Sequence, residues 1–177
     1  MSARLSEATG RRFGLKGPRA AAALEELGIN LPAQPNTWAP LHADEADLPA
    51  DIIGRLGSTE FFIEESGDAA RITRLEELTI RGVAGVYPVL REDCALVLAG
   101  PAAGDVLAQF CNVNLPALDT AARPVVMTLM IGVAVLVLPQ SSASGTIYRI
   151  WCDPSFGAYL REEFEEAIKR LETGSAP

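Results

Sequence analysis

The sequence contains one histidine, the residue type most often used as a base or metal ligand near neutral pH. His42 lies in a proline-bounded acidic stretch, Ala39-Pro40-Leu41-His42-Ala43-Asp44-Glu45, where nearby carboxylates could support either role. The sequence has no second histidine, and no nucleophile stands in a recognisable arrangement with His42. We therefore interpret His42 as a solvated loop residue.

The three cysteines, Cys94, Cys111 and Cys152, are candidates for a metal site. They lack CxxC spacing, and each falls on or beside a stretch that we expect to be a buried strand or a helix end. We interpret them as buried core thiols and predict no metal site. An odd number of cysteines, in a chain whose first residues are not an apolar signal segment, favours the reducing cytoplasm.

Two further groups could bind an anion. The stretch Gly54-Arg55-Leu56-Gly57-Ser58 has glycines and a hydroxyl but lacks the Gly-Lys-Ser/Thr ending of a phosphate loop, so we predict a turn. Arg11, Arg12, Lys16 and Arg19 form a basic cluster in a chain of net charge −8. This cluster fits either an acidic surface or a cofactor phosphate on a partner, or a solvated face of the protein.

A row of acids near the end of the chain, Glu162, Glu163, Glu165 and Glu166, is typical of the solvent face of a helix. The sequence therefore predicts no catalytic residue and leaves any cofactor-binding residue unassigned. The net charge of −8 disfavours binding to nucleic acid or anionic lipid, since both need clustered Lys and Arg. The longest apolar run, Val125 to Leu138, is too short to span a bilayer, and we interpret it as a buried strand.

The elements that position these residues repeat along the chain. The stretch from Leu15 to Pro32 resembles the stretch from Leu98 to Pro116, and Gly100 follows Gly17 by 83 positions. In each copy an expected strand (Phe13 to Lys16, Cys94 to Ala99) meets a glycine that allows a sharp turn, then a proline suited to the first position of a helix. Gly28 and Asn112 are expected as left-handed helix ends.

The later part of each copy also has strands followed by a helix. Strands are expected within residues 52–64, 125–138 and 146–152, and helices at 68–81 and after Pro154, with Asp153 as its cap. Val83 to Leu90 and Cys94 to Ala99 flank Arg91-Glu92-Asp93 and predict a hairpin that joins the halves into one sheet system.

This order predicts an α+β fold of two fused ferredoxin-like βαββαβ units, with mostly antiparallel sheets and helices on one face. We expect a flexible N-terminus over residues 1–10, a first unit over 11–90, a second over 91–172 in one compact body, and a flexible C-terminus over 173–177.

With these residues in hand, the chain resembles the γ subunits of heterotetrameric sarcosine oxidases, within the wider group of aminomethyltransferase-like, folate-associated folds. The resemblance covers nearly the whole chain. It rests on Arg12-Phe13-x-x-Lys16-Gly17-Pro18-x-Ala20, Arg55-Leu56-Gly57-x-x-Glu60-Phe61, Leu98-x-Gly100-Pro101-x-Ala103 with Leu107 and Cys111, Thr128, and Ser155-Phe156-x-x-Tyr159-Leu160.

The resemblance implies a non-catalytic structural subunit, in a complex that oxidises N-methyl amines, with α, β and δ subunits as partners. It places FAD, FMN, NAD, tetrahydrofolate and zinc on those partners and none on this chain alone. One alternative is a stand-alone tetrahydrofolate-binding or aminomethyltransferase-like protein. Another is an interaction domain of a different complex.

Overall fold

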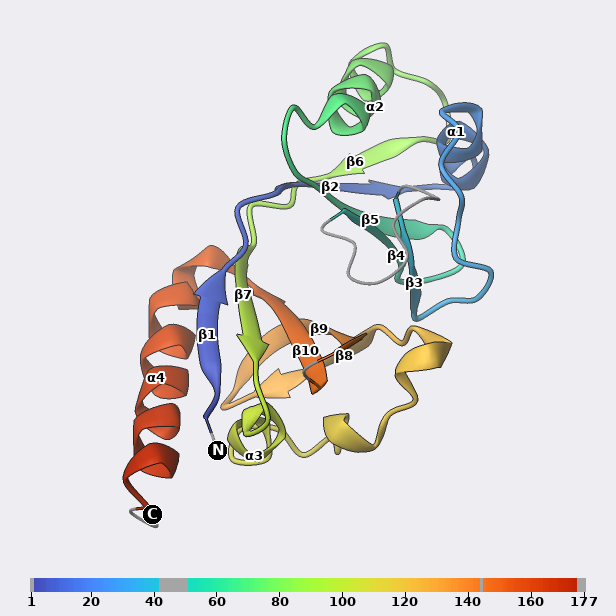
Figure 1. The fold of residues 1–177 in the computed structure, drawn as a ribbon. Coiled ribbons are helices and arrows are strands. Elements are labelled where there is room, and N and C mark those ends of the chain that lie inside the picture. Colours follow the sequence, from blue (N-terminus) through green and yellow to red (C-terminus); the bar gives the residue numbers. More distant parts are fainter. Residues whose placement is uncertain (1, 42–50, 144, 175–177) are drawn as a thin grey trace. The chain divides into compact units, whose positions relative to one another are not determined.

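The structure is a computed structural model that describes residues 2–41, 51–143 and 145–174. Within them the chain forms two antiparallel five-stranded sheets and four α-helices (Figure 1). In chain order the elements are β1 (Arg4–Glu7), β2 (Arg11–Lys16), α1 (Ala20–Glu26), β3 (Thr37–Pro40), β4 (Ile52–Arg55), β5 (Glu60–Glu65), α2 (Ala70–Ile80), β6 (Tyr87–Val89), β7 (Cys94–Ala99), α3 (Ala103–Leu107), β8 (Val126–Met130), β9 (Val133–Ser142), β10 (Gly145–Cys152) and α4 (Gly157–Thr173), with short 3-10 helices at Leu115–Ala117, Thr120–Ala122 and Pro154–Phe156.

The elements divide into two units. Thr9–Glu92 form one, which we call the middle unit, and residues up to Ala8 join those from Asp93 onward in the other, the terminal unit. This differs from the expected flexible N-terminus of residues 1–10, because Arg4–Glu7 form β1 and pair with β7. The physical reason is that Leu5 packs against the core of the terminal unit.

The sheet of the terminal unit has the strand order β1-β7-β10-β9-β8, and that of the middle unit β3-β4-β5-β2-β6. The predicted α+β class is confirmed. The predicted hairpin between Val83–Leu90 and Cys94–Ala99 is wrong, because β6 pairs with β2 whereas β7 pairs with β1 and β10. The place beside β7 is taken by β1, so the expected single sheet system is replaced by two separate sheets.

The predicted repeat is visible in the pairing of these edge strands. Arg4 lies opposite Ala99, and Tyr87 lies opposite Lys16. Arg4 and Tyr87 are 83 positions apart, and so are Lys16 and Ala99. This is the same offset that separates Gly17 from Gly100. β1 is therefore the edge strand beside β7, as β6 is the edge strand beside β2. In the sequence, however, β1 of the terminal unit directly precedes β2 of the middle unit, and β6 of the middle unit directly precedes β7 of the terminal unit.

The turn after the first strand of each copy has the same geometry. Gly17 has φ +124° and Gly100 has φ +106°, values that favour glycine. A Cβ atom would lie 2.4 Å from the Gly85 carbonyl oxygen at Gly17 and 2.6 Å from the Ser2 carbonyl oxygen at Gly100. Pro18 and Pro101 do not occupy the predicted first helical position, because α1 begins at Ala20 after the N-cap Arg19 and α3 begins at Ala103 after the N-cap Ala102. Each strand is nevertheless followed by a helix within four residues.

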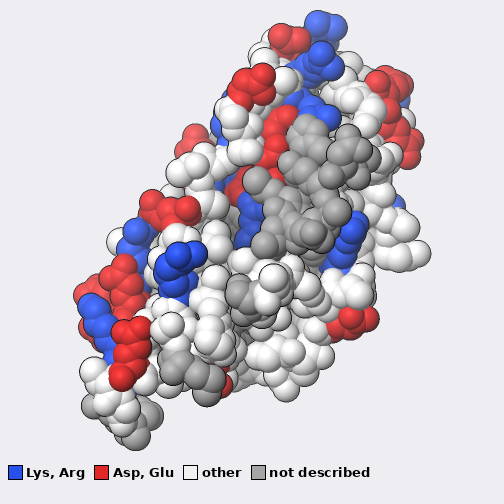
Figure 2. Space-filling view, viewed as in Figure 1, with Lys and Arg blue, Asp and Glu red and all other residues white. Residues whose placement is uncertain are grey.

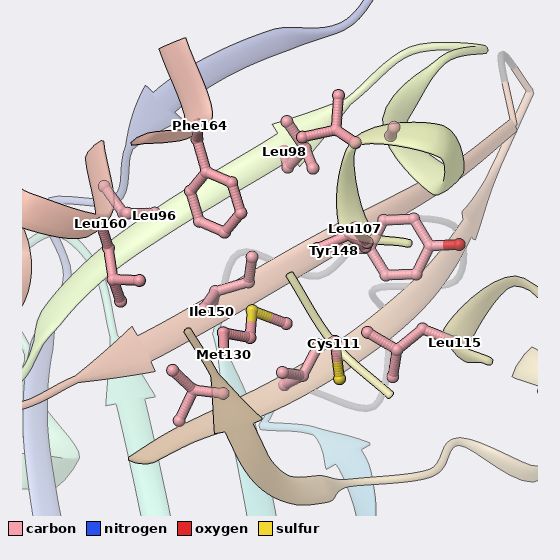
Figure 3. Packing of buried hydrophobic residues seen from close by; sticks show 14 of the residues in the cluster. Leu96, Leu98, Leu107, Cys111, Leu115, Met130, Tyr148, Ile150, Leu160 and Phe164 are labelled. Carbon is pink, nitrogen blue, oxygen red and sulfur yellow. The ribbon is translucent and has the colours of Figure 1, made fainter. Parts of the chain in front are cut away.

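Each unit buries one apolar core between its sheet and its two helices. In the terminal unit, Figure 3 shows Leu107 of α3 and Leu160 and Phe164 of α4 over the strand residues Leu98 and Ile150. In the middle unit, side chains of α1 and α2 share a core with those of β2, β4 and β5. Helices therefore lie on one face of each sheet, as the sequence predicts.

Some local predictions fail. The run from Val125 to Leu138 is not one strand but the hairpin β8–β9, which turns at Ile131 and Gly132, both at positive φ. Gly28 has the expected left-handed conformation, but Asn112 is not among the positive-φ residues of the described chain. α4 continues through Thr173, and residues 175–177 lie outside the described residues.

Candidate functional site

The middle unit contains a cavity of about 600 Å³, within the size range of small-ligand sites. We call it the arginine cavity, because three guanidinium groups are among its lining residues: Gly10, Arg11, Arg12, Phe13, Glu76, Pro88, Val89, Leu90, Arg91 and Glu92. It lies where β2 begins and β6 ends, with α2 contributing Glu76. None of these ten residues carries a hydroxyl, thiol, amine or imidazole group, so the cavity wall offers no nucleophile or base other than carboxylate.

Arg12 enters this cavity from a buried ion pair. Its Nε donates to Glu64 Oε2 at 2.6 Å, across the β2–β5 ladder in which the two residues are direct partners. The side chain of Arg12 is 13% exposed and that of Glu64 only 1%. A charge-assisted bond of this kind fixes the guanidinium plane, so Arg12 is held in place before any ligand arrives.

The other two guanidinium groups also have carboxylate neighbours. Arg11 donates to Glu76 Oε1 at 2.6 Å and to the Thr73 hydroxyl at 3.2 Å, which ties β2 to α2. Arg91 donates to Glu60 Oε1 at 3.5 Å and lies 5.6 Å from the centroid of the Phe62 ring. The three arginines therefore hold the strands and helix together, whatever else they bind.

The structure divides the predicted basic cluster. Arg11 and Arg12 line the arginine cavity, whereas Lys16 and Arg19 are not among its lining residues. Lys16 ends β2, Arg11 begins it, and both Lys16 and Arg19 have exposed side chains. The cavity instead gains Arg91, which the sequence interpretation placed in a hairpin turn.

The buried carboxylates at the end of β5 were also missed. Glu65 is 3% exposed and accepts hydrogen bonds from the backbone N–H groups of Arg71 and Ile72, at 3.0 and 2.9 Å. It therefore caps the first turn of α2, which begins after Ala69 without a side-chain cap of its own. The available signal was that Glu64 and Glu65 continue the strand Phe61-Phe62-Ile63, which places them in the sheet.

The cysteines lie in and against the core of the terminal unit. Cys94 and Cys152 are direct partners on β7 and β10, and Cys111 accepts from the Val113 N–H at 3.4 Å. Burial, and then the neighbouring Cys94 thiol, raise the pKa of Cys152 to about 12. In the part of the chain that the structure describes, no group of three or more His, Cys, Asp or Glu side chains could hold a metal ion.

Two candidates remain, the Gly54–Ser58 stretch and His42. Of the Gly54–Ser58 stretch, Gly54 and Arg55 end β4, and the turn toward β5 begins at Leu56. The Arg55 guanidinium donates to the carbonyl oxygens of Pro32, Ala33, Gly57 and Ser58. His42 falls within residues 42–50, outside the described residues.

The acidic row Glu162, Glu163, Glu165 and Glu166 lies on α4, where three of the four side chains are exposed. Figure 2 shows acidic and basic side chains interspersed over this helix. Glu166 contacts Arg170 one turn on, at 3.5 Å. Among the described helices, none is long and apolar enough to cross a membrane.

The terminal unit also presents apolar side chains to solvent. Met127 and Leu129 of β8 are 56% and 59% exposed, and Phe156 and Tyr159 are exposed where α4 begins. In the middle unit Ile80 and Leu90 are exposed as well. Isolated exposed apolar residues are ordinary, but two neighbours on one face of an edge strand form a patch that a partner can cover.

Comparison with solved structures identifies the fold. The chain is similar to a chain of heterotetrameric sarcosine oxidase from Corynebacterium sp. U-96 in complex with pyrrole 2-carboxylate, with a TM-score of 0.74 and 22% identity over 99% of this chain and 87% of that chain. It is also similar to the glycine cleavage system aminomethyltransferase T from Bartonella henselae, with a TM-score of 0.58 and 19% identity over 92% of this chain. The matched region spans 45% of the aminomethyltransferase.

No protein-family profile and no curated protein sequence matches the chain. The assignment of the fold therefore rests on the similarity to these two solved structures. The class of fold is that shared by the sarcosine oxidase chain and part of the aminomethyltransferase, and the likeness predicted from the sequence motifs is confirmed for the fold.

Proposed function

We propose that this chain is a non-catalytic γ-type subunit of a heterotetrameric, sarcosine oxidase-like complex that oxidises an N-methyl amine. The observation that carries the proposal is the similarity to a chain of such an enzyme over 99% of this chain and 87% of that chain, so the two are close in length. A match that covers most of both chains favours the same kind of subunit.

The chemistry of the described residues supports a role in assembly. The ten residues that line the arginine cavity offer no nucleophile other than the carboxylates of Glu76 and Glu92, and its arginines are engaged with carboxylates of the same unit. Cys152 is buried, and its pKa of about 12 keeps it protonated at neutral pH. In this proposal FAD, FMN, NAD, tetrahydrofolate and zinc belong to the α, β and δ partners, and the complex is cytoplasmic.

The proposal extends to the fold of each unit. With β3 and β8 set aside as additions, the middle unit has the order β4-β5-β2-β6 and the terminal unit the order β9-β10-β7-β1. This is the strand order expected of a ferredoxin-like βαββαβ unit, in which the last strand lies beside the first. We infer that the terminal unit takes its last strand, β1, from the start of the chain.

Co-expression tests the proposed role. A tagged form of this chain, expressed with the flavin-bearing subunits of the same organism, is expected to purify with them, and bound flavin is measured by its visible absorbance. Recovery of the chain alone, free of flavin, would remove the proposal.

The likeness to aminomethyltransferase T keeps a second candidate function, a stand-alone tetrahydrofolate-binding protein. Titration of the isolated chain with tetrahydrofolate separates the two. The subunit proposal predicts no saturable binding at micromolar concentration, and the second candidate predicts that such binding occurs.

A further inference from the structure

The four edge strands of the two sheets differ in how they are protected. β1 carries Arg4 and Glu7, β3 ends in Pro40, and β6 contains Pro88. Charged residues and proline on an edge strand block pairing with another chain, because a buried charge is costly and proline has no N–H to donate. β8, with the sequence Val-Met-Thr-Leu-Met, has neither.

β8 is open on one side. It pairs with β9 in antiparallel register from Val126 opposite Val137 to Met130 opposite Val133, and no strand of the described chain pairs with its other edge. Directly after β8 the Ile131 N–H donates to the Phe110 carbonyl oxygen at 3.1 Å, so the open edge is limited to β8 itself. Along β8 the unprotected edge presents backbone donors and acceptors that match an added strand.

The outer face of β8 is apolar as well. Side chains alternate along the strand, so that Met130 is buried in the core and Val126 packs against it, while Met127 and Leu129 are 56% and 59% exposed. Their direct partners on β9 are Leu136 and Ala134, which extend the uncharged face by one strand. The open edge and the apolar face therefore coincide.

We propose that β8 is the docking edge for an extended, uncharged segment of a partner subunit, which adds a strand beside β8 and covers Met127 and Leu129. This inference rests on the proposed function, since it assigns a surface to the subunit role. The partner segment must be uncharged where it meets this face, because a charged side chain there would lose its hydration without finding an ion-pair partner on β8.

The size of the edge favours a partner subunit over a second copy of this chain. Five residues of strand extend about 17 Å, so β8 pairing with itself would bury far less than the roughly 800 Å² per partner of a stable interface. The occupant must therefore reach beyond β8 to other surfaces of the chain. A partner subunit of the proposed complex meets this requirement, because it must contact this chain over a larger area in any case.

Leu129→Lys, tested in the co-expression experiment, is the direct probe of this edge. It places a charge on the exposed face without touching the core, and the proposal predicts that flavin-bearing partner recovered per mole of chain falls about tenfold or more. Ile80→Lys is the matched control, because Ile80 is an apolar side chain that is 84% exposed on the middle unit. This control is expected to recover as much partner as the unmodified chain.

The outcomes distinguish the proposal for β8 from the proposed subunit role. Normal recovery with Leu129→Lys overturns the β8 proposal and leaves the subunit role intact, whereas failure of the unmodified chain to recover any partner overturns both. Thermal unfolding of each variant establishes that it is folded. If Leu129→Lys does not fold, Leu129→Gln replaces it, with an expected loss of about threefold or more, and full recovery with this variant also contradicts the proposal.

Discussion

Arg12 and Glu64 form an ion pair that is nearly removed from water, with Glu64 1% exposed. Removing charges from water costs several kcal/mol per ion, and only good geometry repays that cost. The pair therefore contributes less to net stability than its distance of 2.6 Å suggests, but loss of one member is costly. We expect the same asymmetry at other buried pairs of the middle unit.

Glu64→Gln tests this asymmetry. It removes the carboxylate that accepts from Arg12 Nε and is expected to lower the free energy of unfolding by about 3–5 kcal/mol, measured by urea denaturation. The double variant Arg12→Met/Glu64→Leu removes both charges and is expected to be clearly more stable than Glu64→Gln. A double variant as unstable as the single one would contradict the account.

Cys152 provides a prediction of reactivity against pH. Its raised pKa of about 12 leaves roughly one thiol in ten thousand ionised at pH 8. We expect iodoacetamide to leave Cys152 unmodified in the folded chain at pH 8 and to modify it in urea, as read by mass spectrometry of its peptide. Rapid labelling of the native protein at this residue would show that its thiol is not buried as described.

The raised pKa of Cys152 also makes the free energy of unfolding depend on pH. Folding raises the pKa of Cys152 above its ordinary value of 9.0. The stability that the protonated thiol contributes is therefore fully present below pH 9 and is lost as pH rises toward about 12. Cys152→Ser, which does not titrate in this range, is expected to flatten the fall in stability above pH 9.

At the scale of the element, the two Gly-Pro turns place a helix directly after a strand in each unit. Gly100→Ala puts a Cβ atom 2.6 Å from the Ser2 carbonyl oxygen at φ +106°, so we expect a loss of about 3 kcal/mol or more by urea denaturation. Gly28→Ala is the matched control. It has φ +73° with nothing within 4 Å, so its loss is expected at about 1–2 kcal/mol. Equal losses would show that the close approach does not matter.

These turns, and the helices after them, could be predicted from the sequence because glycine and proline act locally. The periodic spacing of apolar residues likewise predicted α2 and α4 within a few residues. The hairpin at Ile131 and Gly132 was missed, since residues 125–138 are apolar with only one glycine to mark the turn.

Which strands pair with one another could not be predicted in the same way. Arg4–Glu7 has weak strand character alone and becomes β1 because β7 offers it an edge. The arginine cavity was not predicted, for a related reason. Arg11 and Arg12 are neighbours in sequence, but Arg91 reaches the same cavity only because β6 pairs with β2.

At the scale of the whole molecule, the chain begins in the terminal unit, builds the middle unit and then returns. Deletion of residues 1–8 removes β1, its ladder with β7 and the ion pair between Glu7 and Arg161. We expect a loss of about 1–4 kcal/mol, seen as a lower transition temperature in calorimetry. Deletion of residues 175–177 is the control and is expected to change little. An unchanged transition after the first deletion would mean that β1 adds nothing to the terminal unit.

We propose that this chain holds a flavin-bearing assembly together without chemistry of its own. Size-exclusion chromatography with light scattering of the co-expressed proteins measures this directly. The account predicts one species that contains flavin and this chain and is far heavier than the chain's own 18.8 kDa. A stable, flavin-free species at 18.8 kDa, with the flavoproteins assembled apart from it, would contradict the claim.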